Sequence, residues 1–304
     1  MLKKTLVTGA SGLVGRSLTA ALSNQGCELS LLSANKRKKN GALSYFRWNP
    51  SEGYIDPACL DEVDTIIHLA GAGIAEHRWS PAYKKLILDS RVRGAELLFN
   101  LAEKRNIKIR KFISASGTGI YDSGSDEVYT ETGTPGKGFL TEVCRQWEAA
   151  AGAFVQNGAM VGILRTGVVL APDGGFLEPF KLAMKFRMLP ILGTKRQYIS
   201  WIHLDDLVAM YTRMALEPGF NGVYNAVAPE FVTQNEFLHA LSAAARRKCL
   251  YPQIPAGLIK LLFGGQSELL LNDQKVSARK LLSEGFVFKF PTLKEALANL
   301  YART

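Results

Sequence analysis

The stretch TGASGLVG, residues 8–15, decides the fold of this 304-residue chain. A short apolar run at Leu6–Thr8 precedes it, and leucine and valine recur at helical spacing after it, from Leu13 to Leu22. Gly26 ends the predicted helix, and the leucine-rich stretch Glu28–Leu32 is predicted to be a second strand. A strand, a glycine-rich turn, a helix and a second strand in this order make a βαβ unit.

Three glycines in this stretch are spaced G-x-x-G-x-x-G: Gly9, Gly12 and Gly15. Such glycines allow a tight turn, let the backbone approach a pyrophosphate closely, and let the helix pack against the strand. The free N–H groups and the dipole of the new helix favour phosphate charge. Because the glycines follow a strand and open a helix, they predict a dinucleotide site.

The end of the second predicted strand indicates which dinucleotide is bound. Proteins that select NAD usually carry an acidic residue there, which binds the ribose hydroxyls. Residues Leu32–Asn35 contain no acid, and the cations Lys36–Lys39 follow. Cations suit a 2′-phosphate, so we predict that NADP(H) is favoured over NAD(H). In the alternative, the lysines form a solvated loop, and Ser33 with Asn35 serves either cofactor.

Strand and helix patterns alternate through the first half of the chain. Further strands are predicted at Thr65–Leu69, Lys111–Ser114 and Gly162–Arg165, and helices at Tyr83–Glu103 and Thr141–Val155. Apolar, non-alternating strands between helices are typical of a parallel sheet that is covered on both faces. The predicted class is therefore α/β, a Rossmann-type doubly wound parallel sheet with a smaller C-terminal substrate lobe.

The sequence pattern changes after about residue 170, where proline and glycine interrupt the alternation. We predict an NAD(P)-binding Rossmann domain over 1–170, with 195–228 returning to it, and a substrate-binding lobe over 171–194 and 229–304. Within these segments the patterns predict helices at 205–216, 236–245 and 293–301, and a late strand at 222–226.

Charge and composition exclude several other classes of protein. The chain has 37 basic and 27 acidic residues, a net charge of +10, but the basic clusters are scattered and lack interleaved aromatic residues. We therefore expect an anionic small ligand and no nucleic-acid partner. Four widely spaced cysteines and four histidines show no metal-ligand spacing, so no metal is expected. Reduced cysteines and the lack of a long apolar run predict a cytoplasmic protein without a membrane partner.

Motifs along nearly the whole chain resemble the extended short-chain dehydrogenase/reductase superfamily. More narrowly, they resemble its atypical branch, the epimerase family or nucleoside-diphosphate-sugar epimerase-like proteins. The motifs that carry the resemblance are HLAG at 68–71, RW at 78–79, DSR at 89–91, ISAS at 113–116, WE at 147–148, LRTGVVL at 164–170 and SWIH at 200–203.

This resemblance implies a set of cofactor-binding residues. The residues implied at the pyrophosphate, in addition to the three glycines, are Ser11, Leu13 and Val14. Those implied at the 2′-phosphate are Ser33 with Lys36 or Arg37, although family members often carry an arginine where this chain has Ala34. Those implied along the rest of the cofactor are Leu69, Ala70, Gly71, Arg91, Ser114, Gly167 and Val168.

The usual catalytic pair of the superfamily is missing. Superfamily enzymes typically use a tyrosine with a lysine four residues later, because a phenol needs a nearby cation to act as a base at neutral pH. None of the ten tyrosines has such a lysine. The two positions fall at Leu140 and Cys144, or one residue earlier at Phe139 and Val143. Ordinary dehydrogenase or epimerase chemistry is therefore in doubt.

Three residues are candidates for replacing this chemistry. Ser116 is the candidate active-site hydroxyl that polarises a carbonyl, and Tyr121 could present a phenol. Cys144 could place a thiol near the cofactor. Each has a structural alternative, namely hydrogen bonding at a strand end for Ser116, packing under a lid for Tyr121 and a small buried side chain for Cys144.

The candidate substrate residues are Arg78, Trp79, Arg196, Gln197, Trp201 and His203. The arginines suit a phosphorylated or carboxylated substrate, and the last four lie where extended members hold a nucleotide-sugar. Two alternatives stay open. Arg78 and Trp79 could form a structural cation–π contact, and His203 with Asp205 could simply begin a helix.

Two functions follow from these observations. The first is an NADP(H)-dependent oxidoreductase or epimerase-like enzyme that acts on a small polar, perhaps nucleotide-linked, substrate. In it a hydride passes to or from the nicotinamide, and Tyr121 or a bound water handles the proton. The second is a catalytically silent protein that binds NADP(H) and senses redox state. The sequence leaves open whether the chain is a monomer or a homodimer.

Overall fold

The structure is a computed structural model that describes residues 4–34, 38–40, 43–124 and 126–302. The chain divides into two compact units. The first comprises Met1–Ser116, Glu142–Leu164 and Leu207–Val223, and the second comprises Gly117–Thr141, Arg165–Asp206 and Tyr224–Thr304. These boundaries differ from the predicted lobes, chiefly because 117–141 belongs to the second unit. The predicted lobes, as functional divisions, stay a prediction.

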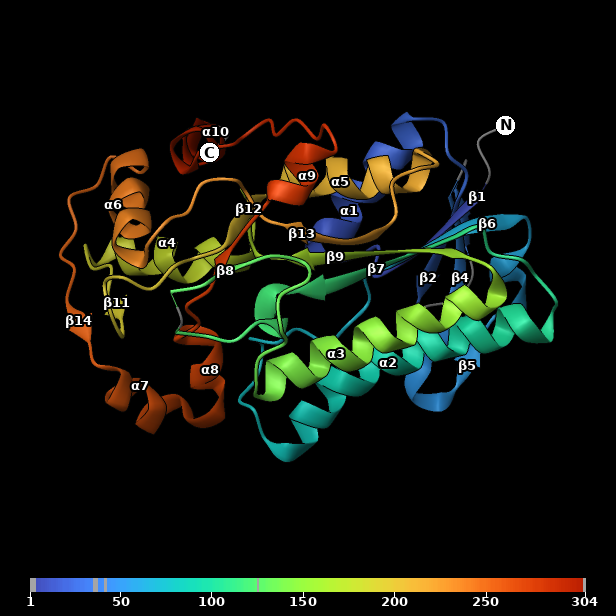
Figure 1. Ribbon diagram of the computed structural model, residues 1–304, viewed down its shortest axis with the longest axis horizontal. Helices are drawn as coiled ribbons and strands as arrows, with labels where there is room; N and C mark the ends of the chain where they lie inside the picture. The colour runs from blue at the N-terminus through green and yellow to red at the C-terminus, as the bar shows by residue number, and fades with distance from the viewer. Residues whose placement is uncertain (1–3, 35–37, 41–42, 125, 303–304) are drawn as a thin grey trace. The chain divides into compact units, whose positions relative to one another are not determined.

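The central sheet has the strand order β13-β9-β7-β6-β1-β2-β4-β3, and β5 pairs with β4 off this path (Figure 1). Its strands are β1 (Lys4–Thr8), β2 (Leu29–Ser33), β3 (Lys38–Asn40), β4 (Leu43–Asn49), β5 (Tyr54–Ile55), β6 (Val63–His68), β7 (Lys111–Gly117), β9 (Met160–Thr166) and β13 (Gly222–Ala226). β1 pairs in parallel with β2 and β6, β6 with β7, and β2 with β4, whereas β3 is antiparallel to β4. The predicted Rossmann-type α/β class is confirmed.

The order of the strands reverses at β1, which lies between β2 and β6. Thr8, the last residue of β1, pairs in register with His68, the last residue of β6. In open α/β sheets, ligands bind beyond the carboxyl ends of the strands at such a reversal. The fold therefore places the glycine stretch at the expected ligand edge.

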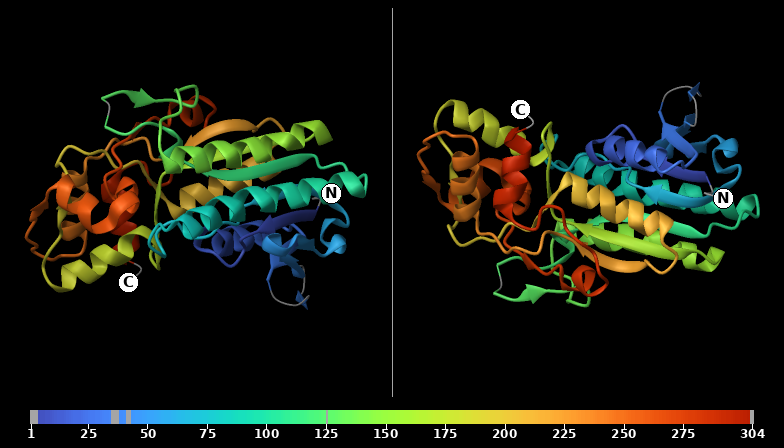
Figure 2. Two further views of the ribbon diagram at one scale, coloured as in Figure 1. Left: turned by 90° about the horizontal axis from the view of Figure 1, so that it is seen from below. Right: turned by 90° about the horizontal axis from the view of Figure 1, so that it is seen from above.

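Four helices cover the sheet, two on each face. They are α1 (Leu13–Asn24), α2 (Pro81–Lys104), α3 (Phe139–Gly152) and α5 (Leu204–Leu216). α2 and α3 lie side by side on one face, and α1 and α5 lie on the other (Figures 1 and 2). Under α2 and α3, the rings of Phe112 and Phe154 stack 3.8 Å apart within a buried aliphatic cluster. This core fixes β7 and its carboxyl end relative to α2 and α3.

A buried lysine anchors the end of α5. Lys111, at the start of β7, is 1% exposed, and its Nζ donates hydrogen bonds to the carbonyls of Met214 and Glu217. Carbonyls at a helix C-terminus carry partial negative charge and suit a cation. Burial, with a smaller contribution from the charge of Arg110, lowers the pKa of Lys111 to about 8.

The second unit has its own helices and three short parallel strand pairs. The helices are α4 (Glu178–Lys185), α6 (Gln234–Ala244), α7 (Ala256–Phe263), α8 (Ser267–Leu270), α9 (Arg279–Ser283) and α10 (Leu293–Ala302). The pairs are β10 (Val168–Leu170) with β12 (Trp201–His203), β11 (Ile191–Leu192) with β14 (Gln253–Ile254), and β8 (Val128–Tyr129) with β15 (Lys275–Val276). Its core joins α6 to α10 through Phe237, Leu241 and Leu297.

The described residues also include six short 3-10 helices, at Pro50–Glu52, Pro57–Leu60, Thr118–Ile120, Ala153–Asn157, Gly175–Leu177 and Gly264–Gln266. Within the described ranges, none of the helices combines the length and apolar character that crossing a bilayer requires. The same residues contain no group of three His, Cys, Asp or Glu side chains placed to hold a metal ion.

Candidate functional site

The glycine loop leaves no room for side chains on its inner side. Gly9 has φ +69°, and a Cβ there would lie 2.9 Å from the Ala70 nitrogen. A Cβ on Gly15 would lie 2.1 Å from the Gly9 carbonyl oxygen, so α1 packs directly against the turn. A Cβ on Gly12 would meet only the Gly9 oxygen, at 3.3 Å, and otherwise open space. The loop is therefore a closely packed cradle with its open side at Gly12.

In the part of the chain that the structure describes, no side chain caps the N-terminus of α1 by accepting a hydrogen bond from its first N–H groups. Gly12 caps the helix without a side chain, and the first turn contains no acidic residue. The first N–H groups of a helix lack partners within it and carry partial positive charge. This end of α1 therefore fits a phosphate group, and the cradle fits the pyrophosphate of a dinucleotide.

A buried hydrogen-bond relay holds the neighbouring residues Leu69 and Ala70. Their N–H groups donate to Thr8 Oγ1, at 3.1 and 3.0 Å. Thr8 Oγ1 also lies 2.9 Å from Nδ1 of the fully buried His68, whose Nε2 lies 3.0 Å from the carbonyl oxygen of Arg91. Because that carbonyl only accepts, Nε2 carries the proton and Thr8 donates to Nδ1. Sequence reasoning missed Thr8, although its place at the end of β1 was a signal.

Residues Leu69–Gly71 form the floor of the site, and Arg91, on α2, lies beside the last of them, Gly71. A Cβ on Gly71 would approach the Arg91 Cζ to 2.9 Å. The Arg91 side chain is 9% exposed, and its Nη1 donates to the carbonyls of Ala72 and Ile87. The structure thus brings together the glycine cradle, the floor Leu69–Gly71 and Arg91, all within the first unit.

The 2′-phosphate prediction is only partly covered by the described residues. Ser33 ends β2, next to β1, and is partly buried. Lys36 and Arg37 lie outside the described residues. The sequence itself shows that the end of β2 carries no acidic residue.

Ser116 has a carboxylate partner that the sequence analysis did not identify. Its hydroxyl, 5% exposed near the end of β7, donates to Glu148 Oε1 on α3 at 2.7 Å. Ser114 is fully buried and donates to the carbonyl of Ala115. A Ser116 hydroxyl that donates to Glu148 has its proton engaged, so its lone pairs are what it offers to a ligand. Polarising a carbonyl would need the opposite orientation.

The positions of the missing tyrosine and lysine are occupied by buried, compact side chains. Leu140 is 8% exposed and Cys144 is 6% exposed. The one-residue alternative, Phe139 and Val143, places an equally buried valine, 3% exposed, at the lysine position. Neither alignment gives a phenol or an ammonium group, so α3 supplies no acid/base pair of the usual kind.

Tyr121 belongs to a buried network in the second unit. It is 2% exposed, and its hydroxyl donates to Asn225 Oδ1 at 2.6 Å and accepts from Arg165 Nη1 at 2.9 Å. Burial raises the pKa of Tyr121, and the hydrogen bond from Arg165 lowers it in part. Glu131 extends the network by accepting from the Asn225 N–H at 2.8 Å. The Tyr121 hydroxyl is therefore engaged both as a donor and as an acceptor.

A Tyr121→Phe variant separates a structural role from a catalytic one. We expect it to lose about 1–3 kcal/mol of unfolding free energy, because Asn225 and Arg165 each lose a buried partner. The NADPH affinity should stay within about twofold of that of the unmodified protein, a difference of under 1 kcal/mol. Denaturant unfolding and cofactor titration measure both quantities. A stable variant that has lost turnover would make Tyr121 catalytic instead.

The predicted substrate residues divide between the units. In the first unit, Arg78 is exposed, whereas Trp79 is 8% exposed and donates from Nε1 to the carbonyl of Ile74 at 2.8 Å. The indole N–H thus closes the segment 74–79, and Nζ of Lys84 lies over the Trp79 ring, 5.7 Å from its centroid.

In the second unit, two predicted substrate residues present buried donors. Gln197 is 5% exposed and accepts from the Thr194 N–H at 2.7 Å, and Trp201 is 1% exposed. Among the described residues, neither Gln197 Nε2 nor Trp201 Nε1 has an acceptor. Arg196 beside them is exposed. Buried donors without partners are rare in folded proteins and indicate a ligand or an ordered water.

His203 matches its structural alternative. It is fully buried, and its Nδ1 accepts a hydrogen bond from the Asp205 N–H at 3.0 Å, in the first turn of α5. Its ring also lies 4.0 Å from that of Phe290. Gly167 and Val168 donate to the carbonyls of Ala226 and Ser200, and a Cβ on Gly167 would lie 2.5 Å from the Ser200 oxygen. Gly167 is therefore needed for close packing inside the second unit.

Comparison with known proteins identifies the family. Residues 5–226 match the NAD dependent epimerase/dehydratase family, and residues 254–300 match DUF1731, a domain of unknown function. The chain belongs to the NAD-dependent epimerase/dehydratase family. The resemblance inferred from the sequence motifs is confirmed.

Relatives of this family member extend over its whole length. It is 36% identical to an epimerase family protein of Mycobacterium bovis over 98% of this chain and 97% of that one. It is 34% identical to an epimerase family protein of Staphylococcus saprophyticus over 98% and 99%. The human epimerase family protein SDR39U1, solved with NADPH, is similar in structure with a TM-score of 0.86 and 28% identity, over 99% of this chain and 100% of that one. A nucleoside-diphosphate sugar epimerase of Corynebacterium glutamicum has a TM-score of 0.79 at 29% identity, over 100% of this chain and 59% of that one.

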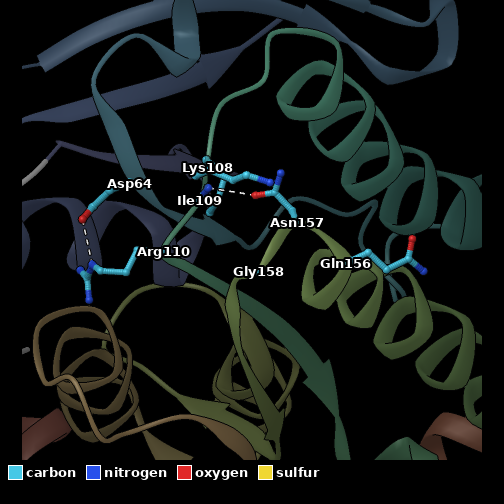
Figure 3. A pocket seen from close by; sticks show the side chains of 7 residues that line it. All are labelled: Asp64, Lys108, Ile109, Arg110, Gln156, Asn157 and Gly158. Carbon is cyan, nitrogen blue, oxygen red and sulfur yellow. Dashed lines mark hydrogen bonds and ion pairs between the residues drawn. The ribbon is translucent and has the colours of Figure 1, made fainter.

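The epimerase-family member also has a hollow of about 540 Å³ at the opposite edge of its sheet (Figure 3). It is lined by Asp64, Lys108, Ile109, Arg110, Gln156, Asn157 and Gly158. Asp64 pairs with Arg110 at 2.8 Å, and Asn157 accepts from the Ile109 N–H at 2.9 Å. These polar groups bind one another near the amino ends of β6 and β7, far along the strands from the glycine cradle. The hollow is therefore not the candidate site.

Proposed function

We propose that this protein binds NADP(H) in preference to NAD(H) and acts as an oxidoreductase or epimerase-like enzyme on a small polar, possibly nucleotide-linked, substrate. The observation that carries the proposal is the cradle at Gly9–Gly15, which leads into a helix N-terminus without an anionic partner. The human relative solved with NADPH supports this choice of cofactor. So does the absence of an acid at the end of β2.

The residues of the cradle would hold the cofactor in this proposal. The N–H groups at the start of α1 would bind the pyrophosphate, and the floor Leu69–Gly71 would contact the dinucleotide. Ser33 with Lys36 or Arg37 would bind the 2′-phosphate. Bound NADP(H) would supply hydride transfer at its nicotinamide. Gln197 and Trp201, with their buried free donors, are the groups that we assign to acceptors on the substrate.

Ser116 and Glu148 form the proton-holding pair in this proposal. The Ser116 hydroxyl proton is directed to Glu148 Oε1, which leaves the Ser116 oxygen able to accept a hydrogen bond from a substrate hydroxyl. When that hydroxyl is oxidised, its proton passes to Ser116 Oγ and the serine proton passes to Glu148. Reduction of the carbonyl reverses both transfers. This arrangement needs neither the tyrosine nor the lysine of the usual pair.

The test is turnover of bound NADPH against a panel of carbonyl compounds. Once a substrate is found, Ser116→Ala and Glu148→Gln should each lower kcat by about 100-fold or more, the usual contribution of general acid–base catalysis. NADPH affinity should change little. Glu142→Gln, an exposed carboxylate on the same helix that pairs with Arg145, is the matched control. Unchanged kcat in both Ser116→Ala and Glu148→Gln would remove the pair from the mechanism.

A second function is favoured by one specific observation. Leu140 and Cys144 fill the positions of the usual pair with buried, non-basic side chains. A protein that binds NADP(H) without turning it over, and reports redox state, would need no such pair. Tight NADPH binding with no oxidation by any carbonyl compound, in the unmodified protein, would favour this function over the enzyme.

A further inference from the structure

Four large apolar side chains are exposed together around the end of α4 in the second unit. The exposed fractions of Leu182, Phe186, Met188 and Leu250 are 58%, 73%, 44% and 72%. Leu182 and Phe186 are four residues apart at the end of α4, so they share one face, and Met188 pairs with Leu250 in a parallel β-bridge. Single exposed apolar residues are common, but a group of them indicates an interaction surface. We call these four residues the apolar tip.

The backbone holds the apolar tip outward. The N–H groups of Phe186 and Met188 both donate to the carbonyl of Ala183, which closes the end of α4. The Leu250 N–H donates to the carbonyl of Arg187 at 2.9 Å, which ties the two segments of the tip together. The opposite side of α4 packs on α6 in the core of the second unit (Figure 1). The exposure of these side chains is therefore built into the fold.

Cations flank the apolar tip in both segments that form it. Neither 179–190 nor 237–267 contains an acidic residue. Glu178, at the start of α4, is engaged by Lys181 at 2.8 Å. The exposed cations of the two segments, which we call the basic rim, are Lys185, Arg187, Arg246, Arg247 and Lys248. The surface thus combines protruding apolar side chains with a local excess of positive charge.

This charge limits what can cover the apolar tip. A second copy that docked through the same face would bring two basic rims together, and like charges across an interface repel. A nucleic acid would attract the rim, but its bases bind by stacking on aromatic rings, and Phe186 is the one aromatic residue of the tip. A bilayer with anionic lipids suits both parts, because its surface attracts cations and its headgroup–acyl boundary accepts apolar side chains.

We propose that the apolar tip and the basic rim together bind the surface of a bilayer that contains anionic lipids. The tip enters the headgroup region, and the rim contacts the lipid phosphates. The sequence-based expectation of no membrane partner rested on the lack of a spanning segment, which a surface contact does not need. The proposal is independent of the proposed function, because its residues lie in the second unit and the dinucleotide cradle lies in the first.

The test is co-sedimentation of the intact protein with vesicles of phosphatidylcholine alone and with vesicles of phosphatidylcholine and phosphatidylglycerol in equal parts. We expect binding to the mixed vesicles to be at least about tenfold tighter, because they carry anionic headgroups. Phe186→Ser combined with Leu250→Ser should weaken this binding by about tenfold or more, since it removes apolar side chains from the interface. Leu258→Ser combined with Leu261→Ser, which removes two exposed leucines from α7, is the matched control and should bind normally. An equal loss in both variants would contradict the role of the tip.

A charge-reversal pair tests the basic rim in the same assay. Lys185→Glu combined with Lys248→Glu should abolish the preference for the mixed vesicles. Lys104→Glu combined with Lys108→Glu makes the same change in net charge at exposed cations of the first unit, and should keep most of the preference. Thermal unfolding should be unchanged in these variants, because the substituted side chains are exposed. Equal binding of the unmodified protein to both kinds of vesicle would overturn the proposal. Binding to a DNA oligonucleotide in place of the vesicles, lost in the rim variant and kept in the tip variant, would assign the surface to nucleic acid and overturn it too.

Discussion

A Gly12→Val variant is expected to fold normally and to lose dinucleotide binding almost completely. Gly12 has φ −73°, which any residue adopts, and a Cβ there meets protein only at the Gly9 oxygen, at 3.3 Å. The added side chain therefore extends into the space where the pyrophosphate would approach α1. We expect NADPH affinity to fall by at least about 100-fold, equivalent to about 3 kcal/mol, while the unfolding free energy changes by less than about 1 kcal/mol.

Two other glycines serve as controls for this variant. A Cβ on Gly15 would lie 2.1 Å from the Gly9 carbonyl oxygen, so Gly15→Ala should destabilise the protein by about 3 kcal/mol. Gly152 has no heavy atom within 4 Å of its added Cβ, and Gly152→Ala should change neither stability nor binding. Calorimetric titration and thermal unfolding of the three variants measure both effects. Full NADPH affinity in a folded Gly12→Val protein would place the cofactor elsewhere.

Acid should destabilise the protein through His68. Burial, with a smaller contribution from the nearby Arg91 charge, lowers the pKa of His68 to about 4, and the hydrogen bond to the Arg91 carbonyl partly opposes this shift. In the unfolded chain the pKa is about 6.5, so between these values the unfolded state binds more protons. The stability that neutral His68 contributes is therefore complete above about pH 6.5 and is lost as the pH falls toward 4, by about 3 kcal/mol.

The His68→Gln variant isolates this contribution. A glutamine can accept from Thr8 and donate to the Arg91 carbonyl, but it does not titrate. We expect the variant to lack about 3 kcal/mol of the pH dependence between pH 6.5 and 4, as measured by denaturant unfolding at a series of pH values. If the two proteins show the same slope, His68 is not the group whose protonation is coupled to unfolding.

The fold could be predicted from the sequence because its decisive features are local. The glycine spacing, the apolar strands and the amphipathic helices each occupy a short stretch. The strand at 222–226 and the helix at 293–302 were predicted to within a residue. β4 was not predicted, since its exposed Arg47 and partly buried Ser44 resemble a loop. α7 was missed because the sequence before it, with Pro252 and Pro255, indicates turns.

The candidate site was less accessible to sequence reasoning, because its chemistry depends on partners far apart in the chain. The bond from Ser116 to Glu148 spans 32 residues, and that from Tyr121 to Asn225 spans 104. A motif identifies Ser116 and Tyr121 as candidates without showing where their protons are directed.

The most direct test of the central claim is a calorimetric titration of the purified protein with NADPH and with NADH, after removal of any copurified nucleotide. We predict micromolar NADPH binding and an NADH affinity at least about tenfold weaker, a difference of about 1.4 kcal/mol. Equal affinities would contradict the preference for the 2′-phosphate. A folded protein that binds neither would contradict the claim that the Gly9–Gly15 cradle is a dinucleotide site.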